Sequence, residues 1–165
     1  MPNIKLHLFG AFYVTRSGQL WDGFRSGKTR ALLAYLALAG VFPVRRTHLA
    51  ELLWDGYPPP MARASLRMAL VNLRQLLDPY DLLLTTNQIV QFKLTDPNFW
   101  CDVLAVEALL TTSTDETKAP TKQTVAQLYQ GEFLRDFEAI DSPPFQIWLQ
   151  KKRRFYAQLL MNFET

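Results

Sequence analysis

Arginine side chains recur along residues 61–77, at a spacing that could serve the phosphates and bases of a nucleic acid. If this segment is a helix, it carries Arg63, Arg67 and Arg74 on one flank. Guanidinium groups suit phosphates and guanine edges, asparagine can pair with adenine, and apolar side chains can touch thymine methyl groups. The other candidate contacts are Ala64, Met68, Val71 and Gln75, which point outward, and Ser65 and Asn72 on the second flank. A basic amphipathic helix with a solvated face has the same pattern, so that alternative stays open.

Further polar and cationic residues stand near the starts of two expected helices and in an expected hairpin. Paired arginines precede the second of these helices, where free backbone N–H groups could help them to hold a phosphate. The hairpin residues are candidate contacts to the DNA backbone. The residues concerned are Lys28, Arg45, Arg46, Thr85, Thr86 and Lys93. Solvated side chains are the ordinary alternative for each of them.

The types and spacings of the remaining polar residues do not match a catalytic or metal-binding motif. Residues 24–29 resemble a phosphate-binding loop, but that motif needs a glycine where this chain has Asp22. Cys101 is the only cysteine and there are two histidines, so we expect neither a disulfide nor a zinc site. We interpret four acidic residues as charges on helix surfaces: Asp102, Glu107, Glu132 and Asp136. We therefore expect no enzyme, no cofactor and no metal.

The strands that must position these groups follow from alternating apolar residues and from turn signals. Residues 4–9 and 11–14 predict two strands, and a turn leads to a third over residues 19–21. Residues 82–86 and 89–94 alternate in the same way and predict a hairpin. The chain should therefore open with a small antiparallel sheet and close its first part with a β-hairpin.

Three helices are expected between the sheet and the hairpin. Ser26 can cap a helix that Gly40 ends, and this helix is apolar on nearly all sides, which is typical of a buried element. Thr47 can cap a second helix ending near Trp54. The third helix, over 61–77, has one apolar stripe that should face the core: Leu66, Leu70, Leu73 and Leu77.

The character of the chain changes near residues 96–99. Residues 1–97 hold eleven Lys and Arg against six Asp and Glu, whereas residues 98–165 hold seven against nine. A basic first half favours a polyanionic partner. The second half predicts helices over 102–111, 121–137 and 144–163, with a polar loop over 111–121.

This order of elements predicts an α+β winged-helix domain over residues 1–97, built from a small antiparallel sheet, three helices and a hairpin wing. In such domains one helix enters the major groove, here the helix over 61–77. An all-α segment over residues 98–165 follows. The N-terminus lacks a signal peptide pattern, and the longest apolar run, 31–42, is too short to span a membrane. We expect a cytoplasmic, nucleoid-associated protein.

Several segments resemble one family of bacterial regulators. Residues 26–36, Leu52-Leu53-Trp54, residues 64–77 and Tyr129-Gln130-Gly131-Glu132-Phe133-Leu134 are similar to those of the SARP transcriptional activators. That resemblance implies an OmpR-type winged helix joined to a bacterial transcriptional activation domain with tetratricopeptide-like helices. Because family members are much longer, it also implies that these 165 residues are an N-terminal fragment.

The resemblance implies sequence-specific DNA binding that activates transcription in bacteria. Double-stranded DNA is the expected partner, with RNA polymerase and a second copy of the chain on repeated half-sites as further expected partners. In OmpR-type activators the loop matching residues 55–60 touches RNA polymerase, which here implicates Asp55, Tyr57, Pro58 and Pro59. The alternatives are a structural hinge for this loop and, for the whole chain, a protein-interaction module whose winged helix no longer reads DNA.

Overall fold

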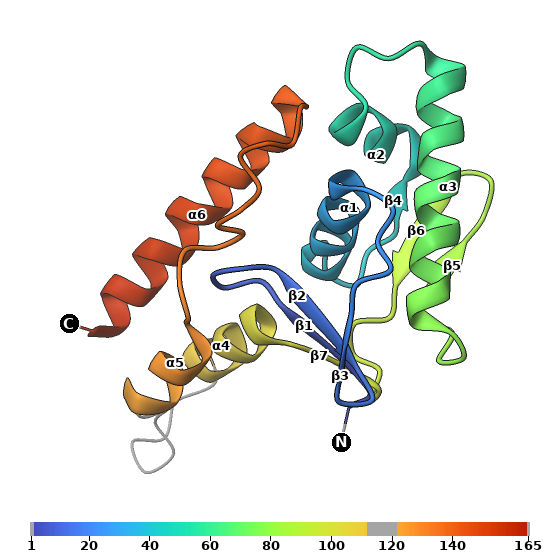
Figure 1. The fold of residues 1–165 in the computed structure, drawn as a ribbon. Helices are drawn as coiled ribbons and strands as arrows, with labels where there is room; N and C mark the ends of the chain where they lie inside the picture. Colours follow the sequence, from blue (N-terminus) through green and yellow to red (C-terminus); the bar gives the residue numbers. More distant parts are fainter. Residues whose placement is uncertain (1, 112–121, 165) are drawn as a thin grey trace.

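The computed structural model describes residues 2–111 and 122–164, and in these residues it combines two small sheets with six helices. The helices are α1 (Gly27–Leu38), α2 (Arg46–Leu53), α3 (Pro59–Leu77), α4 (Asp102–Thr111), α5 (Lys122–Leu128) and α6 (Pro143–Glu164). The strands are β1 (Ile4–His7), β2 (Tyr13–Arg16), β3 (Gln19–Trp21), β4 (Val44–Arg45), β5 (Leu83–Thr85), β6 (Ile89–Phe92) and β7 (Phe99–Cys101). Figure 1 shows α3 along one side of the molecule and α6 along the opposite side, with α1 and α2 between them.

The first sheet has the strand order β3-β2-β1-β7. Strands β1, β2 and β3 are antiparallel neighbours, as predicted, although β2 covers residues 13–16 rather than the predicted 11–14. Strand β7 pairs with β1 in parallel, with Ile4 opposite Phe99 and Leu6 opposite Cys101. The sheet therefore takes its last strand from beyond residue 97, a pairing that the sequence analysis did not anticipate.

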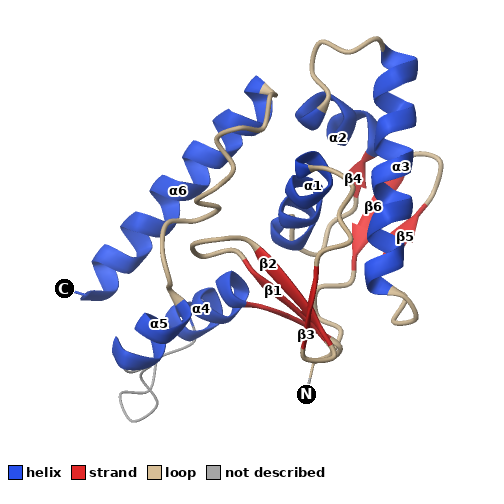
Figure 2. Ribbon diagram, viewed as in Figure 1, coloured by secondary structure: helices blue, strands red, loops and turns tan. Residues whose placement is uncertain are grey.

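The second sheet has the order β4-β6-β5, and its β5–β6 hairpin confirms the predicted one. Strand β4 consists of two residues only, with Val44 opposite Val90 and Arg45 opposite Ile89. Figure 2 shows this sheet beside α3. Because β4 leads directly into α2, the pairing holds the start of α2 against the hairpin.

The three expected helices of the first part are present. The Oγ atom of Ser26 accepts a hydrogen bond from the backbone N–H of Thr29 and caps α1, as predicted. The expectation that Thr47 caps α2 is wrong, because α2 begins at Arg46 and its cap residue, Arg45, makes no side-chain hydrogen bond to the helix. Helix α3 begins at Pro59, where a proline is tolerated because the first N–H groups of a helix have no partner within it.

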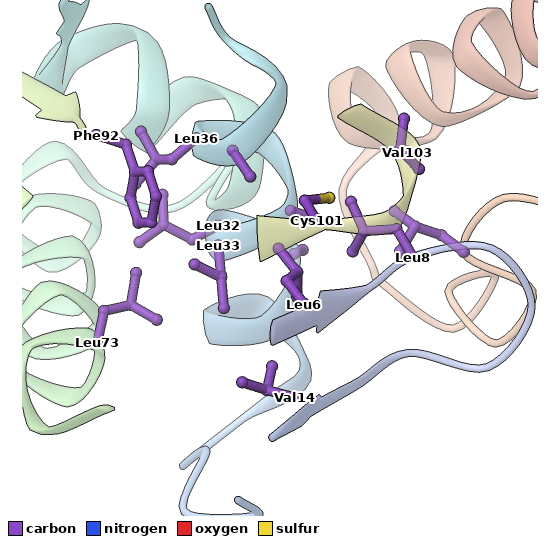
Figure 3. Close-up of a cluster of buried hydrophobic side chains, with 14 of the residues drawn as sticks. Leu6, Leu8, Val14, Leu32, Leu33, Leu36, Leu73, Phe92, Cys101 and Val103 are labelled. Atoms are coloured by element: carbon purple, nitrogen blue, oxygen red, sulfur yellow. The ribbon is translucent and has the colours of Figure 1, made fainter. Parts of the chain in front are cut away.

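Helix α1 lies at the centre of the hydrophobic core. It buries Ala31, Leu32, Leu33, Ala34, Leu36 and Ala37 on several sides, as the continuous apolar run predicts. Figure 3 shows Leu32 and Leu33 between the first sheet, represented by Leu6, and Leu73 of α3. Burial of a leucine side chain contributes about 1.5–3 kcal/mol to folding, so this helix holds sheet and α3 together.

The segment after α5 departs from the prediction, which placed a single helix over 121–137. The helix ends at Leu128, and the following backbone bonds to residues 8–10 instead of continuing. The N–H of Leu134 donates to the carbonyl oxygen of Leu8 at 2.8 Å, and that of Gly10 donates to Glu132 at 3.0 Å. A Cβ atom on Gly131 would lie 3.0 Å from the Cα of Gly10, so glycine at this position allows the two backbone segments to approach each other closely.

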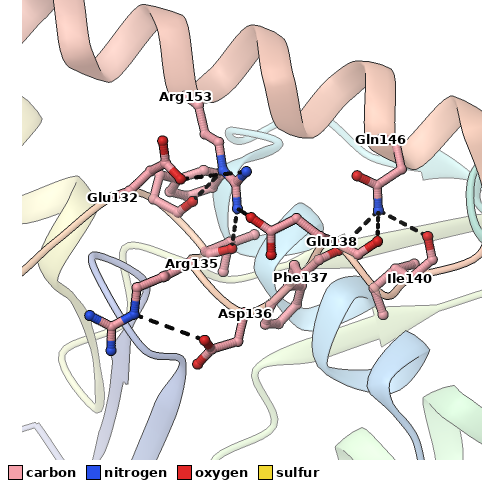
Figure 4. A network of polar contacts seen from close by, with 10 residues as sticks. Glu132, Arg135, Asp136, Phe137, Glu138, Ile140, Gln146 and Arg153 are labelled. Carbon is pink, nitrogen blue, oxygen red and sulfur yellow. Dashed lines mark hydrogen bonds and ion pairs between the residues drawn. The ribbon is translucent and has the colours of Figure 1, made fainter.

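Arg153 of α6 fixes this segment from the other side (Figure 4). Its guanidinium donates to the carbonyl oxygens of Phe133 at 2.9 Å and Leu134 at 2.7 Å. The same group pairs with Glu138 at 2.9 Å and with Glu132 at 3.5 Å. Only 8% of the Arg153 side chain is exposed, so these bonds satisfy a nearly buried cation.

Asp102 is buried rather than a charge on a helix surface, which corrects the sequence interpretation. Its carboxylate oxygens accept backbone N–H groups from Leu8 at 2.9 Å, Phe9 at 3.0 Å and Val103 at 2.8 Å. The side chain therefore ties the end of β1 to the start of α4. The polar segment expected as a loop lies, apart from Thr111, outside the described residues. None of the helices in the described ranges has the length and apolar character that a membrane span requires.

Candidate nucleic-acid interface

The outward face of α3 displays Arg63, Ala64, Arg67, Met68 and Val71, all exposed to solvent. Met68 is 47% and Val71 43% exposed although both are apolar. The leucine stripe is buried, as predicted: Leu66, Leu70, Leu73 and Leu77. Of the described residues in the second half of the chain, those of α6 run along the side of the molecule opposite α3 (Figure 1).

Asn72 is not available to read an adenine, which corrects the expectation for this residue. Only 1% of its surface is exposed. Its Oδ1 accepts the backbone N–H of Arg25 at 2.8 Å, and its Nδ2 donates to the carbonyl oxygen of Gly23 at 2.9 Å and to Gln75 at 3.1 Å. The side chain thus anchors the segment before α1 onto α3.

That anchoring brings Arg25 to the flank on which Asn72 was expected to act. An open depression of about 330 Å³ lies between the start of α1 and α3, and Arg25 lines it together with Ala64, Ser65 and Met68. Arg25 is exposed. Its role could not be predicted from the sequence, because a single arginine before a helix cap carries no signal of its own. Arginines therefore flank the apolar residues of α3 on both sides.

Arg46 connects the start of α2 to the hairpin turn. Its Nε donates to the carbonyl oxygen of Thr86 at 2.7 Å, and its backbone N–H donates to Gln88 at 2.8 Å. The Thr86 hydroxyl already accepts two backbone N–H groups of the turn, from Gln88 and Ile89 at 3.1 Å each. Arg45 is exposed beside this turn, opposite Ile89, so the structure brings both arginines to the turn of the hairpin.

Two further cations are engaged within the protein. The guanidinium of Arg74 donates to the Thr85 hydroxyl and joins the second half of α3 to β5. The ammonium of Lys93 lies 3.6 Å from the carboxylate of Asp81, in an exposed ion pair. Exposed ion pairs contribute little to stability, so Lys93 can exchange partners more readily than Arg74.

Lys28 lies apart from the hairpin, against the loop between α2 and α3. Its Nζ is 4.5 Å from the centre of the Tyr57 ring and 3.4 Å from the Tyr57 hydroxyl. Tyr57 remains 44% exposed, and its backbone N–H donates to the carbonyl oxygen of Trp54 at 3.1 Å. Asp55, Pro58 and Pro59 are also exposed. The loop therefore exposes the Tyr57 ring, which the Lys28 ammonium contacts.

Residues 101 and 102 form a buried titratable pair away from this face. Burial raises the pKa of the Asp102 carboxyl from 3.8 to about 6, against the lowering effect of the backbone N–H groups that it accepts. Burial also raises the pKa of the Cys101 thiol, so it stays protonated and poorly nucleophilic. Within residues 2–111 and 122–164, no cluster of His, Cys, Asp and Glu side chains is arranged to hold a metal ion.

Neither a protein-family model nor a curated protein sequence matches this chain. Among solved structures, Mycobacterium tuberculosis EmbR in complex with a low-affinity phosphopeptide is similar, with a TM-score of 0.73 and 22% sequence identity. The likeness covers 98% of this chain and 43% of that chain, so this chain spans less than half of its neighbour. At this identity the likeness shows a shared fold.

Proposed function

We propose that the chain is a bacterial transcription regulator of the SARP type that binds specific DNA sequences and activates transcription. The observation that carries the proposal is the exposed outward face of α3, whose apolar centre has arginines on both flanks. Residues 1–97 then act as the winged helix, with α3 in the major groove and the β5–β6 hairpin as the wing. The likeness to EmbR supports this assignment at the level of the fold.

In this proposal the helices after residue 97 begin the bacterial transcriptional activation domain, with tetratricopeptide-like packing. The parallel pairing of β7 with β1 joins this part to the DNA-binding part, as does the bonding of residues 132–135 to residues 8–10. A signal received by the helices could therefore reach the first sheet through a rigid connection rather than a flexible linker.

The loop that joins α2 to α3 is proposed to contact RNA polymerase. Proline restricts the backbone, so the loop loses little entropy when it meets a partner, and a tyrosine is a residue type enriched at interfaces. The exposed ring of Tyr57, fixed by Lys28, supports this role. An open depression of about 180 Å³ beside it is lined by Trp54, Pro59 and Arg63 among others.

A salt titration of DNA binding tests the proposal. Four arginines are assigned to phosphates in this proposal: Arg25, Arg45 and Arg63, which are exposed, and Arg46, which is half-buried and donates to Thr86. If each neutralises one phosphate, the logarithm of the binding constant should fall with the logarithm of salt concentration with a slope of about −4. The set of phosphate contacts expected from the sequence omits Arg25 and adds Lys28, Arg74 and Lys93. These six contacts would give a slope of about −5. No salt-dependent binding would favour the protein-interaction module instead.

A further inference from the structure

Apolar side chains occupy the centre of the face that the proposed function places in the major groove. Ala64, Met68 and Val71 follow one another at spacings of four and three residues, which places them along one line of α3. Met68 and Val71 stay 47% and 43% exposed, so burial among the described residues 2–111 and 122–164 does not account for them. Apolar side chains on an exposed helix face indicate an apolar partner surface.

Polar groups that could compete for base contacts near this line are few. Asn72 is turned inward and its hydrogen-bonding groups are used, and the Gln75 side-chain oxygen accepts one of its N–H groups. Hydrogen bonding to bases is left mainly to Arg67, since Arg63 and Arg25 on the two flanks are assigned to phosphates. The apolar line itself can recognise only an apolar group on the DNA.

The thymine C5-methyl group is the apolar group that base pairs present in the major groove. We infer that Met68 and Val71 select thymine by contact with its methyl group, within a core of the operator that lies beside a guanine contacted by Arg67. Ala64 and Val71 are seven residues apart, which is about 10 Å along a helix and about three base-pair steps. The inference rests on the proposed function and specifies which bases the same face of α3 prefers.

Replacement of thymine by deoxyuridine tests the inference, because it removes the methyl group and keeps every hydrogen-bonding group. Bound sequences are first selected from a random DNA pool, and each thymine of the core is then replaced singly in a synthetic duplex. Each contacted position should lose about fourfold in affinity, since burial of one methyl contributes about 0.8 kcal/mol. Thymines outside the core should lose nothing measurable.

Matched protein variants assign the effect to individual side chains. In Val71→Ala the uracil penalty should shrink to less than about twofold at one position and persist at the others, and Met68→Ala should do the same at a different position. Both residues are exposed on a helix, so the variants should fold, which circular dichroism checks. Ile147→Ala, which removes an apolar side chain that is 59% exposed on α6, should leave every penalty unchanged.

The possible results separate this inference from the proposed function. Selective, salt-dependent binding without any uracil penalty would overturn the inference and leave the proposed function standing. A penalty that survives unchanged in both α3 variants would overturn the assignment to Met68 and Val71. Failure to bind any DNA selectively would overturn the proposed function, and the inference with it.

Discussion

Replacement of Asn72 by alanine should destabilise the fold rather than remove a base contact. The side chain is 1% exposed and bonds to the N–H of Arg25 and the carbonyl oxygen of Gly23, at 2.8 and 2.9 Å. Each such hydrogen bond contributes about 1 kcal/mol to stability. A buried backbone group that loses its hydrogen-bond partner destabilises the fold by more than this. We therefore expect the free energy of unfolding to fall by about 2–4 kcal/mol.

Urea unfolding followed by circular dichroism measures this change, and the slope of the transition shows whether the native state stays compact. Met61→Ala is the matched control, because it removes a side chain that is 56% exposed on the same helix and should change stability by less than about 0.5 kcal/mol. The folded fraction of Asn72→Ala should keep its preference at every base position. Unchanged stability together with a lost adenine preference would refute the reasoning and restore Asn72 to the DNA-reading face.

Four further predictions follow from the same geometry. Leu70→Ala should lower the free energy of unfolding by about 2–5 kcal/mol, because Leu70 is 3% exposed; unchanged thermal stability would reverse the face assigned to α3. The folded state holds the Asp102 proton more tightly than the unfolded chain, so the resulting stabilisation is complete below pH 3.8 and disappears as the pH rises through about 6. Urea titrations should show the free energy of unfolding of the wild type falling by about 3 kcal/mol relative to that of Asp102→Asn across this pH range. The same pH dependence in both proteins would contradict a raised pKa of the Asp102 carboxyl. Arg67→Ala should weaken specific binding by about 1–3 kcal/mol, whereas equal losses on specific and random DNA would make it a phosphate contact. Tyr57→Ala combined with Pro59→Ala should keep DNA affinity within about twofold and lower promoter activation at least about tenfold; a joint loss would make the loop a hinge.

Local patterns predicted the parts of the fold that local interactions determine. The apolar run of α1, its Ser26 cap and the leucine stripe of α3 each depend on residues a few positions apart, and all three are confirmed. The hairpin is confirmed for the same reason. These elements were enough to identify the outward face of α3 before its exposure was known.

Contacts between distant residues account for what the sequence did not reveal. Strand β7 has three residues, too few for a periodic signal, and it exists because it pairs with β1 almost a hundred residues earlier. The segment after α5 has helical periodicity, yet its backbone bonds to residues 8–10 and to Arg153. Likewise, the hydrogen bonds of Asn72 to the backbone of Gly23 and Arg25 join residues almost fifty positions apart. Because of them, Asn72 is buried and Arg25 lies on the flank of α3 where Asn72 was expected.

The claim that α3 reads DNA is tested most directly by the ratio of affinities for a selected sequence and for random DNA. The chain of 165 residues is incubated with a random duplex pool, bound sequences are enriched, and both affinities are measured at one salt concentration. The account predicts a recurring sequence that binds at least about a thousandfold more tightly than random DNA. A pool that yields no recurring sequence, with equal affinities for all duplexes, would contradict it.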